Sequence, residues 1–142
     1  MFVIEKENAE NELRVCLFKA MCSQHGVPCR TVALPEEVIP QNISARAREF
    51  YSKFAPVDIT IEALHVRFLP YYEVFDIIRE HSGIIPIALY KEQQIVYIDM
   101  YPDGTWDDRV QLEIGDGRVE VLGTDIFDYL SNLAKRIGDE IP

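Results

Sequence analysis

Long apolar segments are absent from this 142-residue chain. No run approaches the roughly 18–20 apolar residues that a membrane-spanning helix needs. The opening residues, MFVIEKE, have neither a basic lead nor a long apolar stretch, which predicts that there is no secretory signal. We therefore expect a cytoplasmic protein that does not bind membranes.

Basic residues are also few, with 14 Lys and Arg against 24 Asp and Glu, a net charge of −10 and a sequence pI near 4.7. Proteins that bind phosphate backbones do so through Lys and Arg. The composition therefore argues against a nucleic acid or an anionic membrane as partner. It favours a basic protein, because complementary potentials speed encounter and suppress wrong pairings.

Cysteine is scarce, and all three cysteines lie within the first 29 residues. An odd number of cysteines in a cytoplasmic protein predicts reduced thiols. Cys16, Cys22, His25 and Cys29 form an alternative, a zinc site. Their spacing, C-x5-C-x2-H-x3-C, matches no common zinc motif. We expect free thiols, no metal and no cofactor, and leave zinc as an alternative.

Catalytic signatures are missing as well. The sequence contains no G-x-S-x-G, P-loop, G-x-G-x-x-G or H-E-x-x-H motif. The acidic turn around Asp103 fails as a calcium-binding EF-hand, because Tyr101 and Val110 would occupy positions that require oxygen ligands. We expect no enzymatic activity, with a small hydrolase that uses Cys22 and His25 as the remaining alternative.

Periodicity predicts four helices, over residues 7–24, 44–54, 71–81 and from 126 onward. Residues 27–41, with three prolines, are predicted to be a connector. In the first helix the i, i+3, i+4, i+7 spacing predicts a core-facing stripe of Leu13, Cys16, Leu17 and Ala20. Thr124 or Asp125 is expected to cap the last helix, whose apolar stripe is Ile126, Leu130, Leu133, Ala134 and Ile137.

Alternation with a period of two predicts strands. They cover residues 57–61 and 64–68 (two strands, or one with a bulge), 84–90, 95–101, 109–114 and 118–122. In the last two strands we expect these residues to face the core: Val110, Leu112, Ile114, Val119 and Val121. The sequence thus predicts a single α+β domain over residues 1–142. Its mainly antiparallel central sheet is a β-meander with flanking helices and a closing C-terminal helix.

Acidic residues concentrate in one part of the chain. From Asp99 to Asp128, nine acidic residues stand against two arginines, a local balance of −7. The single tryptophan, Trp106, lies there, and tryptophan is enriched among interface anchors. We expect a partner-binding surface formed by Tyr101, Asp103, Trp106, Asp107, Asp108 and Glu113. The alternative is a solvated turn in which Trp106 packs over the sheet edge as core.

Several segments together resemble the SUKH superfamily of fungal cell-wall assembly regulators and bacterial immunity proteins. They are Phe50-Tyr51 in a helix, Ile85-Pro86-Ile87-Ala88-Leu89, Ile95-Val96-Tyr97-Ile98-Asp99, the turn Pro102-Asp103-Gly104 and a final helix with Phe127 near its start. The resemblance covers residues 34–138 and leaves the helix at 7–25 as an extension. Lys91-Glu92-Gln93-Gln94 stands where members commonly have glycines, and the asparagine-glycine that usually follows the family's first helix is missing.

The SUKH resemblance implies an α+β fold without enzymatic activity whose function is to bind a protein. In bacterial members that protein is a toxin, often a nuclease, which the immunity protein neutralises. We therefore expect an immunity protein for a basic toxin domain. The alternative within the same family is a general scaffold or regulatory interaction module.

Overall fold

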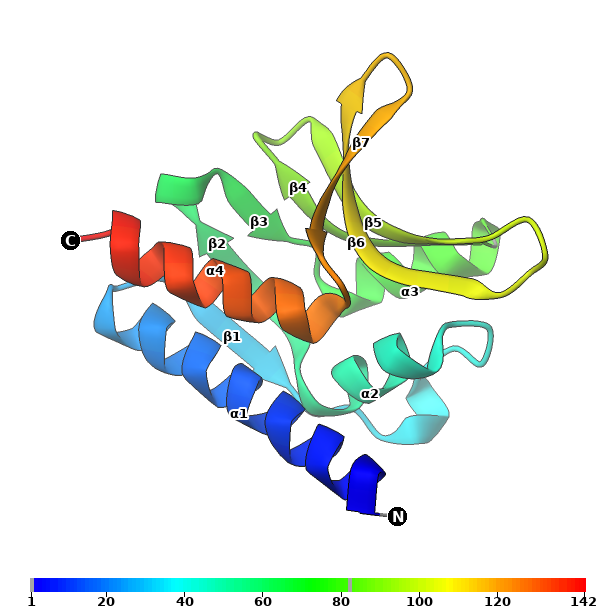
Figure 1. Cartoon of the computed structure of the whole chain (residues 1–142), viewed down its shortest axis with the longest axis horizontal. Helices are drawn as coiled ribbons and strands as arrows, with labels where there is room; N and C mark the ends of the chain where they lie inside the picture. The colour runs from blue at the N-terminus through cyan, green and yellow to red at the C-terminus, as the bar shows by residue number, and fades with distance from the viewer. Residues whose placement is uncertain (1, 82) are drawn as a thin grey trace.

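A seven-stranded antiparallel sheet runs through the middle of the molecule, and its strands lie side by side in the order in which they occur along the chain (Figure 1). The computed structural model describes residues 2–81 and 83–142, with side chains described from Lys6 onward. The strands are β1 (Cys29–Val32), β2 (Ala55–Ile61), β3 (Val66–Phe68), β4 (Ile84–Tyr90), β5 (Gln94–Met100), β6 (Trp106–Gly115) and β7 (Arg118–Gly123). The helices are α1 (Phe2–Gln24), α2 (Ala45–Lys53), α3 (Tyr71–Glu80) and α4 (Ile126–Glu140), with short 3₁₀-helices η1 (Glu36–Val38) and η2 (Glu62–Leu64). The predicted α+β class with an antiparallel meander is confirmed.

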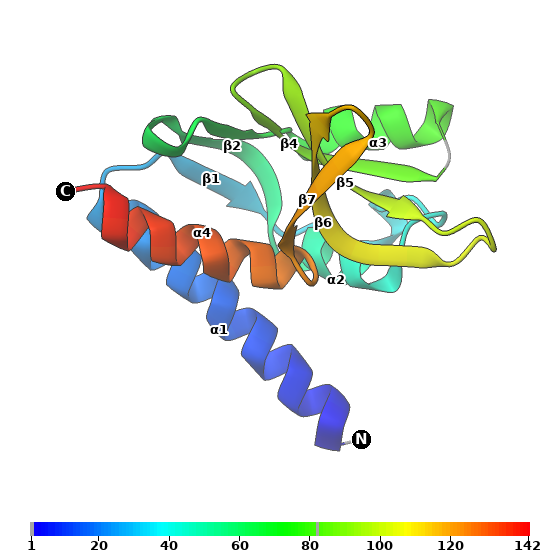
Figure 2. The same ribbon diagram turned by 45° about the horizontal axis from the view of Figure 1, so that its top comes forward.

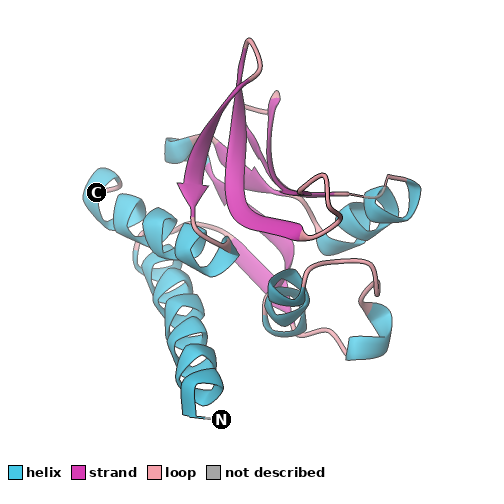
Figure 3. Cartoon of the chain, turned by 45° about the vertical axis from the view of Figure 1, so that its right-hand side comes forward, coloured by secondary structure: helices cyan, strands magenta, loops and turns pink. Residues whose placement is uncertain are grey.

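Helices flank the sheet on both sides. Figure 3 shows α1 and α4 on one side of the strands and α3 on the other. In Figure 2, α4 runs over the sheet, and α1 lies against α4 before its N-terminal half extends away from the body. The predicted apolar stripe of α4 is buried at all five positions, and across from it the alternate residues Val96, Ile98, Val110 and Leu112 of the sheet are buried too.

Aromatic side chains connect the two helical layers through α2. Phe50 packs against Phe127 of α4, with ring centroids 5.8 Å apart. Its neighbour Tyr51 packs against Phe75 of α3 at 5.1 Å. Because successive residues of a helix point about 100° apart, one short helix at the end of the sheet reaches the core on both sides. Phe50 and Tyr51 are at most 1% exposed.

Side-chain caps fix the starts of α2 and α4. Ser44 Oγ accepts a hydrogen bond from the Ala47 amide at 3.0 Å. Asp125 Oδ1 accepts one from the Asp128 amide at 2.8 Å. Of the two residues predicted as the possible cap of α4, Thr124 and Asp125, the cap is therefore Asp125. Each cap satisfies an amide that has no partner within its helix.

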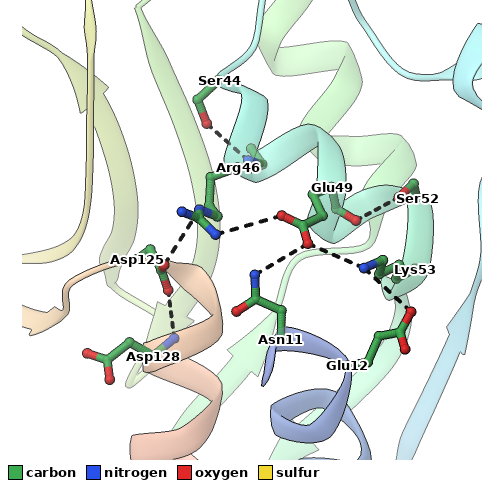
Figure 4. Close-up of polar contacts among 10 residues, drawn as sticks. Asn11, Glu12, Ser44, Arg46, Glu49, Ser52, Lys53, Asp125 and Asp128 are labelled. Carbon is green, nitrogen blue, oxygen red and sulfur yellow. Dashed lines mark hydrogen bonds and ion pairs between the residues drawn. The ribbon is translucent and has the colours of Figure 1, made fainter. Parts of the chain in front are cut away.

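An ion-pair cluster joins the middle of α1 to α2 and to the start of α4 (Figure 4). The Glu49 carboxylate accepts a hydrogen bond from the buried Asn11 side chain at 3.3 Å and pairs with Lys53 at 3.3 Å and Arg46 at 3.8 Å. Arg46 also lies 3.6 Å from the Asp125 carboxylate. The partners come from three helices, so we assign this cluster a structural role.

Strand predictions needed several corrections. The predicted connector at 27–41 contains strand β1, which pairs with β2 from Cys29 opposite Ile59 to Val32 opposite Ala55, and it also contains η1. The predicted strands at 57–61 and 64–68 are two strands, separated by η2. Strand β6 starts at Trp106, three residues before the predicted start, because its first residues pair with the end of β5.

The core-facing side of α1 was predicted wrongly. Leu13 and Leu17 are 59% and 52% exposed, and Cys16 and Ala20 are exposed as well. The buried residues are Asn11, Val15, Phe18 and Cys22. Both sets follow helical spacing, so α1 has two apolar stripes, and periodicity alone could not distinguish the inner stripe from the outer one.

The inward positions at the β6–β7 hairpin were also wrong in part. Val110 and Leu112 are buried as predicted, but Ile114, Val119 and Val121 are 41%, 44% and 46% exposed. Gln111 lies on the opposite face from Val110 and Leu112 and is nevertheless only 5% exposed. In Figure 1 the tip of this hairpin rises beyond the helices, so the strand alternation continues where no helix covers it.

Gly123 gives a test of the joint between β7 and α4. A methyl group at this position would lie 2.7 Å from the Tyr129 backbone nitrogen and 3.0 Å from the Asp125 carbonyl oxygen. Since backbone atoms cannot move aside, we expect Gly123→Ala to lower the free energy of unfolding by about 2–3 kcal/mol. Urea denaturation measures this change.

Gly138→Ala, within α4, is the matched control. Its added methyl group would meet the flexible end of the Met21 side chain, and alanine is the better helix former by about 1 kcal/mol. Stability unchanged or raised in Gly138→Ala, together with a loss in Gly123→Ala, is the expected pattern. Equal stability of Gly123→Ala and the wild type would contradict the close packing.

Candidate functional site

One face of the sheet is left open over its last three strands. Side chains of alternate residues share a face, and the register places Tyr97 opposite Gln111, and Gln111 opposite Val121. Val119 lies opposite Glu113 in the same way. We call this surface the β5–β7 face. It comprises Ile95, Tyr97, Asp99, Tyr101, Asp107, Arg109, Gln111, Glu113, Val119 and Val121.

The centre of the β5–β7 face is apolar. Ile95 is 44% exposed, and Val119 and Val121 are exposed to a similar extent, with Tyr97 partly exposed beside them. A sheet face that is in contact with water normally carries polar side chains. The exposed β-branched residues therefore mark this face as different from an ordinary solvated sheet surface.

An ion pair forms one end of the β5–β7 face. Arg109 Nη2 donates to Asp107 Oδ2 at 2.7 Å and Arg109 Nε donates to Asp107 Oδ1 at 2.9 Å. The Asp107 side chain is 6% exposed and that of Arg109 50%. These hydrogen bonds from Arg109 hold the pKa of the Asp107 carboxyl below its ordinary value, and the Tyr101 hydroxyl adds to the same effect. Asp107 thus positions Arg109 and is not an accessible carboxylate.

The other carboxylates near the β5–β7 face differ in their hydrogen bonds and in their exposure to solvent. Asp99 Oδ1 accepts a hydrogen bond from Gln111 Nε2 at 3.0 Å. Asp103, in the exposed turn, accepts from the Thr105 hydroxyl at 2.6 Å and the Thr105 amide at 2.9 Å, which lowers the pKa of its carboxyl. Glu113 is exposed on strand β6. Asp103 and Glu113 therefore present the accessible negative charge.

The six residues predicted to bind a partner are split between two sides of the sheet. Tyr101, Asp107 and Glu113 lie on the β5–β7 face, with Asp103 in the turn at its end. Trp106 and Asp108 alternate with Asp107 and so point to the opposite face. Trp106 is half-buried and packs against the hydrophobic core. This agrees with the alternative prediction, in which Trp106 packs over the sheet edge as part of the core.

Sequence reasoning missed the apolar part of this surface. Val119 and Val121 were assigned to the core, and Ile95 and Tyr97 were predicted only as parts of a strand over residues 95–101. What leaves these residues exposed is that they lie on the side of the β6–β7 hairpin that α4 does not cover. That relation depends on packing between elements that are distant in sequence.

The four candidate zinc residues do not all come together. Cys22 is buried and Cys16 is exposed on another side of α1. The hydrogen bond that Cys22 makes with Cys29, together with burial, raises the pKa of the Cys22 thiol, and a protonated thiol is a poor nucleophile. Among the described residues, no group of three or more His, Cys, Asp or Glu side chains is arranged to hold a metal ion.

A cavity of about 290 Å³ lies between the sheet and α4. Its walls are mostly apolar, with Val96, Leu112 and Leu133 among them. Tyr129 also lines it, and its hydroxyl is buried without a hydrogen-bond partner among the described residues. Burial raises the pKa of that hydroxyl, so it is a neutral group at pH 7. Arg136, at the same cavity, is hydrogen-bonded to Glu140 at 2.7 Å.

Comparison with known proteins found no match to this chain among protein-family models, curated proteins or solved structures. The resemblance to the SUKH superfamily therefore stays a prediction from the sequence. None of the helices formed by the described residues combines the length and apolar content needed to cross a bilayer.

The Asp107–Arg109 pair predicts a specific pH dependence of stability. Because the pKa of Asp107 is lowered in the folded state, its contribution is complete above the unfolded-state pKa of about 3.9 and is lost as the pH falls below that value. We expect Asp107→Asn to lower the free energy of unfolding by about 1 kcal/mol at pH 7, since Arg109 is half exposed. The difference from the wild type should shrink at pH 3.

Urea denaturation at the two pH values measures this effect, with Asp116→Asn as the control. The Asp116 side chain is 92% exposed and lies 4.0 Å from Arg118, so its replacement should leave stability unchanged at both pH values. A difference between Asp107→Asn and the wild type that is as large at pH 3 as at pH 7 would show that the ion pair is not its cause.

Proposed function

We propose that this protein is a non-catalytic binding domain for a basic protein and that the β5–β7 face is its contact surface. The observation that carries the proposal is the exposed apolar centre formed by Ile95, Val119 and Val121 beside Tyr97. Interfaces combine such an apolar centre with a polar rim. Large β-branched and aromatic side chains at the centre would supply the area that is removed from water on binding.

The charge of the rim supports a basic partner. Asp103 and Glu113 stand at the two ends of the face and are exposed, and Asp116 at the hairpin tip is 92% exposed. Complementary charge raises the rate of encounter and selects between partners more than it raises the affinity of the final complex. The rim would thus guide a basic surface onto the apolar centre.

The resemblance to the SUKH superfamily supports the class of the partner. We propose a toxin domain with a cationic active-site cleft, which the chain would occlude as an immunity protein. An acidic inhibitor suits such a cleft because the field that attracts a phosphate substrate also attracts carboxylates. A scaffold module with several partners is the competing form of the same proposal.

Internal bonds of the polar groups support a role without catalysis. Asp99 is bonded to Gln111 and Asp107 to Arg109, so these carboxylates are held in place by neighbours. A general base needs a raised or matched pKa near the operating pH, whereas the pKa of Asp107 is lowered. This suits a surface that presents charge.

The experiment is capture of the partner from the host by the tagged chain, followed by binding kinetics with the purified partner. Val119→Ser/Val121→Ser removes the apolar centre, and we expect it to raise the dissociation rate by about tenfold or more. Asp103→Lys/Glu113→Lys reverses the rim, and we expect it to lower the association rate and its dependence on salt.

Glu62→Lys/Asp139→Lys is the control, because it makes the same charge change at two exposed positions outside the face. Binding should be close to that of the wild type in this variant. Unchanged kinetics in both face variants would reject the β5–β7 face as the contact surface. For the toxin class, the captured protein should arrest growth when it is expressed alone and not when it is expressed with the chain; a harmless partner would reject that class.

A further inference from the structure

Cys22 and Cys29 lie side by side although they belong to different elements. Cys22 is on the buried side of α1 near its end, and Cys29 is the first residue of β1. Between them the chain reverses: the Val27 amide donates to the Cys22 carbonyl oxygen at 2.8 Å, and Gly26 has a φ of 68°. Both cysteine side chains pack in the same hydrophobic core, and a hydrogen bond joins the two thiols. The turn thus brings two reduced sulfur atoms together.

The two thiols differ in their access to solvent. Cys22 is buried, whereas Cys29 is only partly buried. Cys29 also lines a shallow surface pocket, together with Lys19, Ser23, Val27, Arg30 and Thr31. None of these lining residues carries a carboxylate, although the chain as a whole has a net charge of −10. A small molecule that enters this pocket therefore meets Cys29 first, in basic surroundings.

These surroundings favour the thiolate form of Cys29. The hydrogen bond from Cys22 lowers the pKa of the Cys29 thiol, and the Lys19 ammonium acts in the same direction, against the opposing effect of burial. The Lys19 nitrogen lies 5.5 Å from the centroid of the Phe54 ring, in the last turn before β2. A cysteine that combines thiolate character with partial exposure is the kind that reacts with oxidants.

We propose that Cys22 and Cys29 are a redox-active pair, which a hydroperoxide converts to a disulfide. In the first step the Cys29 thiolate attacks one peroxide oxygen, the O–O bond breaks, and the departing oxygen takes a proton from water. Cys29 then carries a sulfenic acid. In the second step the Cys22 sulfur attacks the Cys29 sulfur and the S–O bond breaks, while the Cys22 proton leaves with the hydroxyl group as water. The two sulfurs together lose two electrons, and one peroxide is reduced.

The position of Cys22 suits the second step. Its hydrogen bond to Cys29 and its burial raise the pKa of the Cys22 thiol, so it does not compete for the peroxide. Once Cys29 is a neutral sulfenic acid, the first of these causes is removed and the Cys22 sulfur is already beside its target. Rapid closure also protects Cys29 from irreversible oxidation to the sulfinic acid.

The disulfide would fix the end of α1 to β1, the strand at the opposite edge of the sheet from β7. Thiol–disulfide exchange with a dithiol would reverse it. The site shares no residue with the β5–β7 face. The redox pair and the proposed binding function can therefore each fail in experiment without affecting the other.

Mass spectrometry of the full chain after treatment with hydrogen peroxide tests the pair. Trypsin cleaves after Lys19 and Arg30, so one peptide, residues 20–30, contains both cysteines, and Cys16 lies in another, residues 15–19. We expect peptide 20–30 to lose two hydrogen atoms and to resist alkylation, and dithiothreitol should restore both properties. Oxidation of Met21 in the same peptide is distinguished because it adds an oxygen that dithiothreitol does not remove.

Exposed Cys16 is the internal reference for this experiment. If peptide 20–30 stays fully reduced under conditions that oxidise Cys16, the proposal is wrong. A loss of hydrogen that occurs only in covalently linked dimers would overturn it as well, because the proposed disulfide forms within one chain. Neither outcome depends on a variant that has to fold.

Variants separate the two steps. Cys22→Ser should stop the reaction at the sulfenic acid of Cys29, which dimedone traps, whereas Cys29→Ser should leave Cys22 reduced. Lys19→Met should slow disulfide formation several-fold, because it removes the charge that favours the thiolate. Lys6→Met makes the same change at an exposed position near the other end of α1 and should leave the rate unchanged. Trapping by dimedone at Cys22 in place of Cys29 would contradict the proposed order of steps, and equal rates in the two lysine variants would contradict the role of Lys19.

Discussion

Phe50 and Tyr51 are the point at which the two sides of this fold are joined. Phe50 contacts Phe127 of α4 and Tyr51 contacts Phe75 of α3, so α2 ties together helices that lie on opposite sides of the sheet. A nine-residue helix is not stable by itself in water. Its position depends on these two rings, on the Ser44 cap and on the ion pairs of Glu49 shown in Figure 4. The arrangement of the remaining helices follows from that position.

Because the helices meet around α2, the parts of the sheet that they cover lie close to that helix. Helix α4 buries the inner side of β5 and β6 through residues such as Val96, Val110 and Leu112, and α3 lies along β4 on the other side. The outer side of β5, β6 and β7 receives no helix among the described elements (Figure 3). The exposed apolar face on these strands is therefore a consequence of where α3 and α4 pack, and it is available for binding.

The sequence predicted the buried side of an element correctly where the element has only one apolar stripe. Helix α4 has a single apolar stripe, and all five predicted residues are buried; α2 has a recognisable cap in Ser44. Helix α1 was misread because the outer pair, Leu13 and Leu17, follows helical spacing just as the inner pair, Val15 and Phe18, does, and the choice between the two stripes depends on where α4 lies. Val119 and Val121 alternate as predicted, but the register places them with Gln111 and Glu113 on the outer face rather than with Val110 and Leu112 on the side of α4. Asp107 was taken as accessible charge because its pairing depends on the conformation of Arg109, two residues away.

These differences change what the acidity of the chain can do. Several carboxylates of the 99–128 segment are used internally: Asp99 by Gln111, Asp107 by Arg109 and Asp125 by the α4 cap. The charge left for a partner is that of exposed groups such as Asp103, Glu113 and Asp116, spread along the edge of an apolar surface. Screened charges at a rim act mainly on the rate of encounter, whereas buried apolar contacts determine how long a complex lasts. In the proposed complex, specificity for a basic partner and the lifetime of the complex would therefore reside in different residues.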